Sequence, residues 1–181
     1  LTLEKYRKIF KFPVKDYYLE LGFNLEKEPF EVSGLEFINA YENRKYDARL
    51  HPQVLPLLKE LSAKGISHSI LSAQHQALLN DLTQYYNIRD YFIAIIGLDN
   101  HYAYSKIENG IEWVNRSNLN LQKILMIGDT EHDFEVAVAI GIDCILLSHG
   151  HHCSSRLEKT DALVFQNLMD VFSFFNIELI E

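Results

Sequence analysis

Two aspartates follow a strongly apolar run in the second half of the chain. The run from Lys123 to Ile127 (KILMI) leads into Gly128 and Asp129, and Asp133 comes four residues later. Open parallel sheets bind ligands beyond the carboxyl ends of their strands, so Asp129 is expected to face such a crevice. Paired carboxylates suit Mg²⁺, which also keeps several waters. Asp133 by itself would fit a charge at a helix N-terminus, but the pair favours a metal site.

Two further positions could bind a phosphate group. Ser72 ends an expected strand at 67–72, where its hydroxyl and the amide groups around Ala73 could hold a phosphate oxygen. Serine is also an ordinary turn or cap residue at such places. Lys106 opens an expected helix between two strands. A single lysine is usually a solvated surface charge, and Lys106 becomes a candidate because it lies between Ser72 and the acidic loop in the chain.

A histidine-rich stretch follows the strand that is expected to end at Leu147. His149, His151, His152 and Cys153 have side chains that could bind Zn²⁺. Four ligands within five residues do not readily surround one tetrahedral ion, and the spacing of known zinc sites is absent. We interpret the stretch as a polar loop.

The elements that would position these residues alternate regularly from about residue 48. Helices are expected at 52–64, 76–86, 106–117, 131–140 and 168–175, and strands at 67–72, 92–97, 123–127, 143–147 and 162–165. This alternation predicts an α/β fold with a doubly wound, Rossmann-like and mostly parallel sheet. Residues 1–47 instead show apolar side chains at helical spacing and no strand. We therefore predict a partial helical cap at 1–47 and an α/β core at 48–181.

Composition narrows the class of partner. The chain has 17 basic and 25 acidic residues, a formal charge of -8, and 48% hydrophobic residues. Such a surface repels nucleic acids and anionic membranes, so a small molecule is the expected ligand. Cys144 and Cys153 are the only cysteines, which favours a reducing cytoplasm. No signal peptide or membrane-length apolar run is visible, and nothing in the sequence indicates an oligomeric state.

The chain resembles the haloacid dehalogenase superfamily, and in particular its phosphoglycolate-phosphatase-like group. Ser72, Lys106 and the run GDTEHD at 128–133 resemble the second, third and fourth motifs of that superfamily, in the same order. This group inserts a helical cap between its first and second motifs, and residues 1–47 look like the later part of that cap. The resemblance covers nearly the whole chain, and GDTEHD is its most specific piece.

This resemblance implies a function and a role for each candidate residue. The implied protein is a Mg²⁺-dependent phosphatase of a small phosphorylated metabolite that works through an aspartyl-phosphate. Ser72 and Ala73 would hold the transferring phosphoryl group, and Lys106 would offset its negative charge. Asp129 would ligate Mg²⁺, while Asp133 would position a metal-bound water or orient Lys106. Phosphoryl transfer depends mainly on such positioning and charge neutralisation.

The first motif of the superfamily has no counterpart in this sequence. That motif is an apolar strand ending in Asp-x-Asp, whose first aspartate is the covalent nucleophile. Asp16, Asp47 and Asp99 do not match it. The missing strand would also be the centre of the sheet. We expect about thirty residues before Leu1, one strand and one helix, and expect residues 1–181 alone to be inactive.

Four other functions share parts of this pattern. A haloacid dehalogenase needs no metal, so the pairing of Asp129 with Asp133 argues against it. A phospho-receiver domain carries its acids before its lysine, whereas Lys106 precedes Asp129 here. A β-phosphoglucomutase-like phosphotransferase and a catalytically inactive interaction protein on the same fold both remain open. The sequence does not identify the substrate.

Overall fold

Five parallel strands form two separate sheets in the described residues. The computed structural model describes residues 1–98 and 105–177. Strand β1 (His68–His75) pairs with β2 (Phe92–Leu98), and β4 (Asp143–Leu147) lies between β3 (Leu125–Gly128) and β5 (Leu163–Phe165). All the pairings are parallel, as predicted. The expected single sheet is divided, because the described strands β1 and β3 do not pair with each other.

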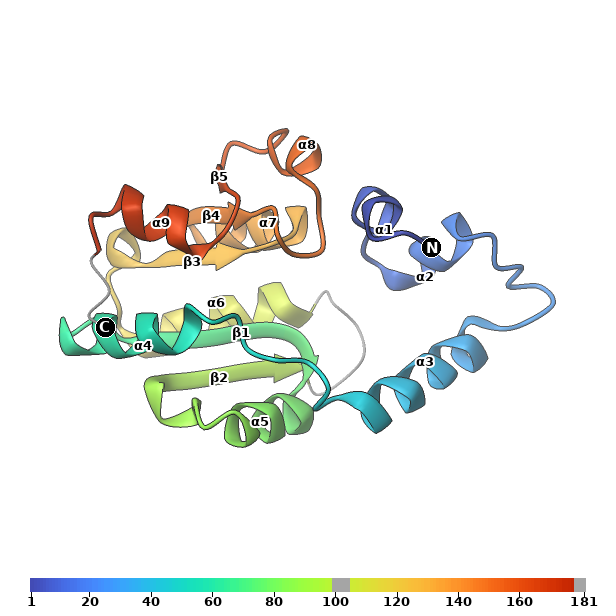
Figure 1. Ribbon diagram of the computed structural model, residues 1–181, viewed down its shortest axis with the longest axis horizontal. Helices are drawn as coiled ribbons and strands as arrows, with labels where there is room; N and C mark the ends of the chain where they lie inside the picture. Colours follow the sequence, from blue (N-terminus) through green and yellow to red (C-terminus); the bar gives the residue numbers. More distant parts are fainter. Residues whose placement is uncertain (99–104, 178–181) are drawn as a thin grey trace.

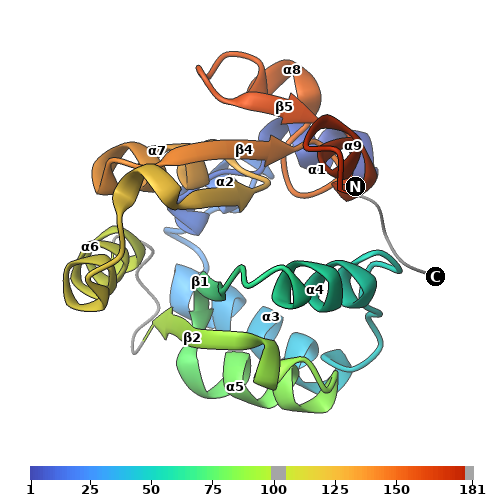
Figure 2. The ribbon, with the colours of Figure 1, turned by 90° about the vertical axis from the view of Figure 1, so that its left-hand side faces the viewer.

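Helices cover both faces of these sheets. Helices α4 (Val54–Ala63) and α9 (Leu168–Phe174) lie on one side, and α6 (Ser105–Ser117) and α7 (Glu131–Ile140) on the other (Figures 1 and 2). Helix α5 (Gln76–Tyr85) packs on β1 and β2. The prediction of a doubly wound α/β fold is confirmed. No helix in the described part of the chain has the length and apolar character needed to cross a membrane.

The first 47 residues are helical, as expected. They form α1 (Leu3–Ile9), α2 (Val14–Glu20) and α3 (Phe30–Arg44). Aromatic side chains join α1 to α2, and the ring of Tyr17 lies edge-on to both Tyr6 and Phe10. Helix α3 is mostly exposed and extends along the side of the molecule (Figure 1). The division into a cap at 1–47 and a core at 48–181 stays a prediction.

Helix α6 packs between the two sheets, and α4, which precedes β1 in the chain, packs against the second sheet. On one face, Leu57 of α4 joins a buried cluster with Ile145 of β4 and with Phe172 of α9. On the other face, Gly110 of α6 approaches the side chains of Leu71 in β1 and Ile140 in α7 so closely that a Cβ there would lie 2.8 Å from each. The two sheets are therefore joined through helices rather than through strand pairing.

Several element boundaries differ from the sequence prediction. Strand β1 does not end at Ser72 but continues to His75, with a register irregularity after Leu71. Residues 121–123 form a short 3₁₀ turn, so β3 begins at Leu125 instead of Lys123. A second 3₁₀ turn at Arg89–Tyr91 and the short helix α8 (Ser154–Leu157) were not expected. These short turns have too few residues to show a periodic pattern.

Burial within α9 predicts a clear difference between two phenylalanines. Phe172 is 2% exposed within the core, whereas Phe174 is 54% exposed. Phe172→Ala should lower the free energy of unfolding by about 3–5 kcal/mol, because it leaves a cavity. Phe174→Ala should cost about 1 kcal/mol, since it loses mainly an edge contact with Phe165. Urea unfolding of both variants measures the two values, and equal losses would contradict this view of the core.

Candidate active site

The carboxylate of Asp133 organises the turn that follows β3. Its Oδ2 atom accepts hydrogen bonds from the backbone nitrogens of Asp129 (3.0 Å) and Thr130 (2.9 Å), and from the Thr130 hydroxyl (2.7 Å). Thr130 is the N-cap of α7 and receives the backbone N–H of Asp133 in return, which completes a capping box. Gly128 allows this packing, because a Cβ there would overlap the Asp133 side chain. The turn is thus held in one conformation by local contacts.

Lys106 forms a buried ion pair with the same carboxylate. The lysine comes from the first turn of α6, is 7% exposed, and donates to the Oδ1 atom of Asp133. Burial alone would raise the pKa of Asp133, but the charge of Lys106, with hydrogen bonds from Lys106 and Thr130, holds that pKa below its ordinary value. Lys106 is therefore not a solvated surface charge. Asp133 both caps a helix and orients Lys106.

A loop after β4 holds Asp129 from the opposite side. The backbone N–H of His151 donates to Oδ2 of Asp129 at 2.6 Å, and that of His152 donates to the Asp129 carbonyl at 3.2 Å. Gly150 is required here, because a Cβ at this position would overlap the Asp129 carboxylate. The Oδ1 atom of Asp129 has no hydrogen-bond partner among residues 1–98 and 105–177. One carboxylate oxygen therefore stays available at the tip of β3.

Helix α1 is docked on this loop. Arg7 donates to the carbonyls of His149 (2.6 Å) and Gly150 (2.9 Å), and the hydroxyl of Tyr6 hydrogen-bonds Nδ1 of His151. Burial raises the pKa of Tyr6 to about 12, and the nearby Tyr17 and Asp129 add to this rise. In Figure 1 the strands β2 and β3 point toward the side of the molecule that carries α1 and α2. The carboxyl ends of these two strands thus lie on the same side of the molecule as these helices.

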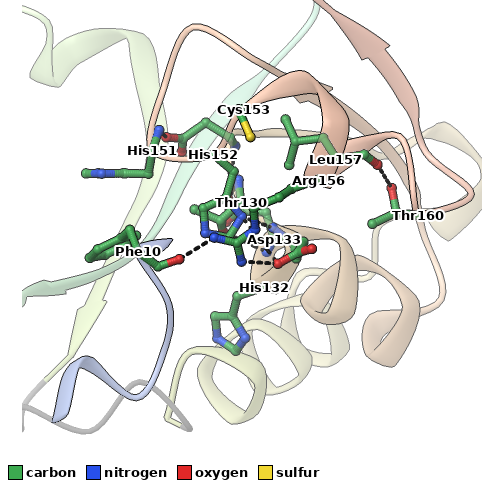
Figure 3. A network of polar contacts seen from close by, with 12 residues as sticks. Phe10, Thr130, His132, Asp133, His151, His152, Cys153, Arg156, Leu157 and Thr160 are labelled. Carbon is green, nitrogen blue, oxygen red and sulfur yellow. Dashed lines mark hydrogen bonds and ion pairs between the residues drawn. The ribbon is translucent and has the colours of Figure 1, made fainter. Parts of the chain in front are cut away.

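Arg156 links α1 to the acidic turn. Its guanidinium donates to the carbonyl of Phe10, just beyond the end of α1, and forms an ion pair with Glu131 at the start of α7. Figure 3 shows the Arg156 side chain between the Phe10 carbonyl and the first turn of α7. None of these three residues stands out in the sequence. Arginine and glutamate are common surface residues, and only the fold brings them together.

Ser72 and Ala73, which were also predicted to bind phosphate, lie in the two-stranded sheet of β1 and β2. Ser72 is inside β1, where its hydroxyl accepts from the backbone N–H of Gln74 at 3.1 Å, and Ala73 follows it in the same strand. Within the described ranges no hydrogen bond joins Ser72 or Ala73 to Lys106 or Asp129. The structure thus brings Lys106, Asp129 and Asp133 together on the α6–β3–α7 side, and their assignment as catalytic, phosphate-binding and metal-binding residues stays a prediction.

The residues of the histidine-rich loop have separate partners. His149 contacts His51, His151 bonds Tyr6, and Nδ1 of His152 accepts the backbone N–H of Glu131. Burial and the charge of Arg156 lower the pKa of His152. No three His, Cys, Asp or Glu side chains gather as metal ligands in the part of the chain that the structure describes. The sequence identified this loop only as polar, whereas it supports Asp129 directly.

Asp129 fits a Mg²⁺ site of the kind that relies on few protein ligands. At a strand tip it offers one carboxylate oxygen that has no partner among the described residues, and Mg²⁺ commonly takes one or two carboxylates together with waters and phosphate oxygens. Both oxygens of Asp133 are already used by hydrogen-bond donors. Asp133 therefore fits the role of orienting Lys106 better than that of a direct metal ligand.

Comparison with known proteins identifies relatives of this chain. A family model described as haloacid dehalogenase-like hydrolase matches residues 1–147. Phosphoglycolate phosphatase 1 of Pseudomonas aeruginosa is 24% identical over 147 residues, which cover 80% of this chain and 54% of that protein. The chain spans about half the length of the curated relatives that it matches.

Solved structures show the same fold. A haloacid dehalogenase-like family hydrolase from Streptococcus pneumoniae superposes with a TM-score of 0.71 at 20% identity, covering 96% of this chain and 88% of its own. Protein Tyrosine Kinase A of Mycobacterium tuberculosis gives a TM-score of 0.77 at 18% identity, covering 94% and 80%. At this level of identity the two similarities establish the fold alone. The names of the two proteins also indicate different activities, a hydrolase and a tyrosine kinase.

The ion pair of Lys106 and Asp133 predicts a non-additive effect on stability. Lys106→Met leaves the buried charge of Asp133 without its counter-ion and should lower the free energy of unfolding by about 3–5 kcal/mol. Adding Asp133→Asn should recover part of this loss, because asparagine removes the charge and keeps an acceptor for the turn. Lys8→Met, at a fully exposed pair with Glu4, is the matched control and should leave stability unchanged. Additive losses in a urea-unfolding cycle would show that the pair is not coupled.

Proposed function

The chain belongs to the haloacid dehalogenase-like hydrolase family, and we propose that it forms the larger part of a Mg²⁺-dependent phosphatase that acts on a small phosphorylated metabolite. The observation that carries this proposal is the buried Lys106–Asp133 pair beside Asp129 at the carboxyl end of β3. It combines a fixed cation with an available carboxylate oxygen. Phosphoryl transfer requires charge neutralisation and positioning of this kind.

Each residue has a role in this proposal that follows from its contacts. Lys106 stays in place because Asp133 accepts its ammonium group in a buried position, so its charge would act on a phosphoryl group at the strand ends. Asp129 would hold Mg²⁺ through its Oδ1 atom. When bound, the cation would neutralise charge on the phosphate oxygens. Ser72 and Ala73 on β1 would hold the same phosphoryl group from the other sheet.

The proposed reaction also needs a carboxylate nucleophile. Residues 1–181 contain no Asp-x-Asp sequence. We propose that the nucleophile lies on a further strand that pairs with β1 and β3, which are edge strands of the two sheets. On β3, Leu125 and Ile127 are each about 40% exposed, although they belong to an apolar strand. A parallel strand in that position would end beside Asp129 and would unite the two sheets.

The assignment of the metal ligand is tested by Asp129→Asn in the full-length protein. Removing one carboxylate charge should abolish Mg²⁺-stimulated hydrolysis of an aryl phosphate and the Mg²⁺-induced rise in melting temperature. The backbone contacts of Asp129 are retained in this variant, so its melting temperature without metal should change little. If Mg²⁺ still stimulates hydrolysis by the Asp129→Asn variant, another residue holds the cation and the proposal fails at this point.

The role of Lys106 is separated from its contribution to stability by the double variant Lys106→Met/Asp133→Asn. This variant should stay folded at low temperature but hydrolyse aryl phosphate at least about a hundredfold more slowly, as expected for the loss of an electrostatic partner of the transition state. The Lys8→Met control should keep the wild-type rate. Near-normal turnover by a folded double variant would assign the buried pair to structure alone.

A further inference from the structure

We propose that His152 is a positioning residue for the turn at 129–131. Its neutral ring accepts a backbone hydrogen bond at Nδ1 and so fixes Asp129 for cation binding. The proposal rests on the proposed function, since it assumes that Asp129 holds Mg²⁺. His152 lies outside every motif that carries the family resemblance.

The two hydrogen bonds of His152 both lead to the turn at 129–131, and its ring also lies edge-on to that of Phe10. The backbone N–H of Glu131 donates to Nδ1 of His152 at 3.1 Å, and the backbone N–H of His152 donates to the Asp129 carbonyl at 3.2 Å. These two bonds run in opposite directions between the same two segments. They hold the peptide units on either side of Thr130 against the loop that also supplies the His151 N–H to the Asp129 carboxylate.

The direction of the Glu131 bond defines the state of the ring. A backbone N–H can only donate, so Nδ1 must present its lone pair and the ring proton must lie on Nε2. His152 is 2% exposed, and its Nε2 has no hydrogen-bond partner in the described parts of the chain. The only side-chain hydrogen bond of this buried ring within those parts is thus the one at Nδ1.

The bond matters for the cation because it adds a side-chain contact to a turn that the loop otherwise holds only through backbone N–H groups. The Asp133 carboxylate holds the nitrogens of Asp129 and Thr130, while the loop at 150–152 holds the carbonyl and the carboxylate of Asp129. The bond from the Glu131 N–H to His152 is the third hydrogen bond between this loop and the turn. Residues that orient a metal ligand typically change metal affinity or activity by about 10–100-fold when they are replaced.

The test compares replacements that keep or lose an acceptor at the place of Nδ1. The amide oxygen of asparagine can stand near Nδ1, whereas the amide of glutamine reaches the place of Nε2. In the full-length protein, His152→Gln and His152→Ala should weaken the apparent Mg²⁺ affinity about 10–100-fold, and His152→Asn should stay within about threefold of wild type. Affinity is measured both by the Mg²⁺ dependence of aryl-phosphate hydrolysis and by the Mg²⁺-induced shift in melting temperature.

A matched control separates this effect from the general loss of a buried histidine. His132 lies on α7, next to the same turn, also has a buried Nε2 without a partner among the described residues, and directs its other nitrogen to Glu135 rather than to the turn. His132→Gln should leave the apparent Mg²⁺ affinity unchanged. A loss as large as that of His152→Gln would mean that any disturbance near α7 weakens the cation site, and it would overturn the proposal.

A second pair of variants tests the same bond from the donor side. Glu131 is the first residue of α7, a position where proline is well accepted, and Thr130 before it has an extended backbone that suits a following proline. Glu131→Pro removes the N–H that His152 accepts, and Glu131→Ala keeps it while removing the same carboxylate. The proline variant should bind Mg²⁺ about tenfold more weakly than the alanine variant.

The outcomes distinguish this proposal from the proposed function. Wild-type Mg²⁺ affinity in His152→Gln, failure of His152→Asn to rescue, or equal affinities of the two Glu131 variants would overturn the role of His152. None of these results affects the assignment of Asp129. A Mg²⁺ response that persists in Asp129→Asn would instead overturn the proposed function itself.

Discussion

The arrangement of the site depends on one buried carboxylate. Asp133 accepts four hydrogen bonds, from the backbone of Asp129 and Thr130, the Thr130 hydroxyl and the ammonium group of Lys106. Burying a single charge is costly unless it is paired and fully hydrogen-bonded, and this one is both. The carboxylate therefore fixes the lysine, the start of α7 and the turn at the end of β3 at the same time. Removing any one of these donors leaves the buried Asp133 carboxylate with an unfilled hydrogen-bonding position.

Two glycines make this concentration of contacts possible. A Cβ at Gly128 would overlap Asp133, and a Cβ at Gly150 would overlap the carboxylate of Asp129. Neither glycine is among those with a positive φ angle, so the reason for glycine at both positions is space rather than backbone conformation. Asp129 is consequently enclosed by backbone from two directions while one oxygen stays available. Backbone N–H groups therefore orient the Asp129 carboxylate, and no second negatively charged side chain is needed to hold it.

Much of the fold could be predicted because its signals are local. The helix at 131–140 and the strand at 143–147 follow from apolar periodicity and from Gly141, which ends the helix in a left-handed conformation. The burial of Lys106 could not be predicted, because it depends on the packing of α6 between β1 and α7. The same is true of His152, whose role depends on a loop that meets the turn 21 residues earlier in the chain. Sequence spacing identified the acidic residues but not what holds them.

The contact between α1 and the α/β part of the chain follows the charges at two helix ends. Arg156 bonds the carbonyl of Phe10 at the C-terminal end of α1 and pairs with Glu131 at the N-terminal end of α7. A cation at a helix C-terminus and an anion at a helix N-terminus are each stabilised by the helix dipole, so Arg156 complements the end of α1 and its partner Glu131 complements the start of α7. The same Glu131 contributes the N–H that His152 accepts. Docking of α1 and the geometry of the Asp129 turn therefore share a residue, and a change at one of them will be felt at the other.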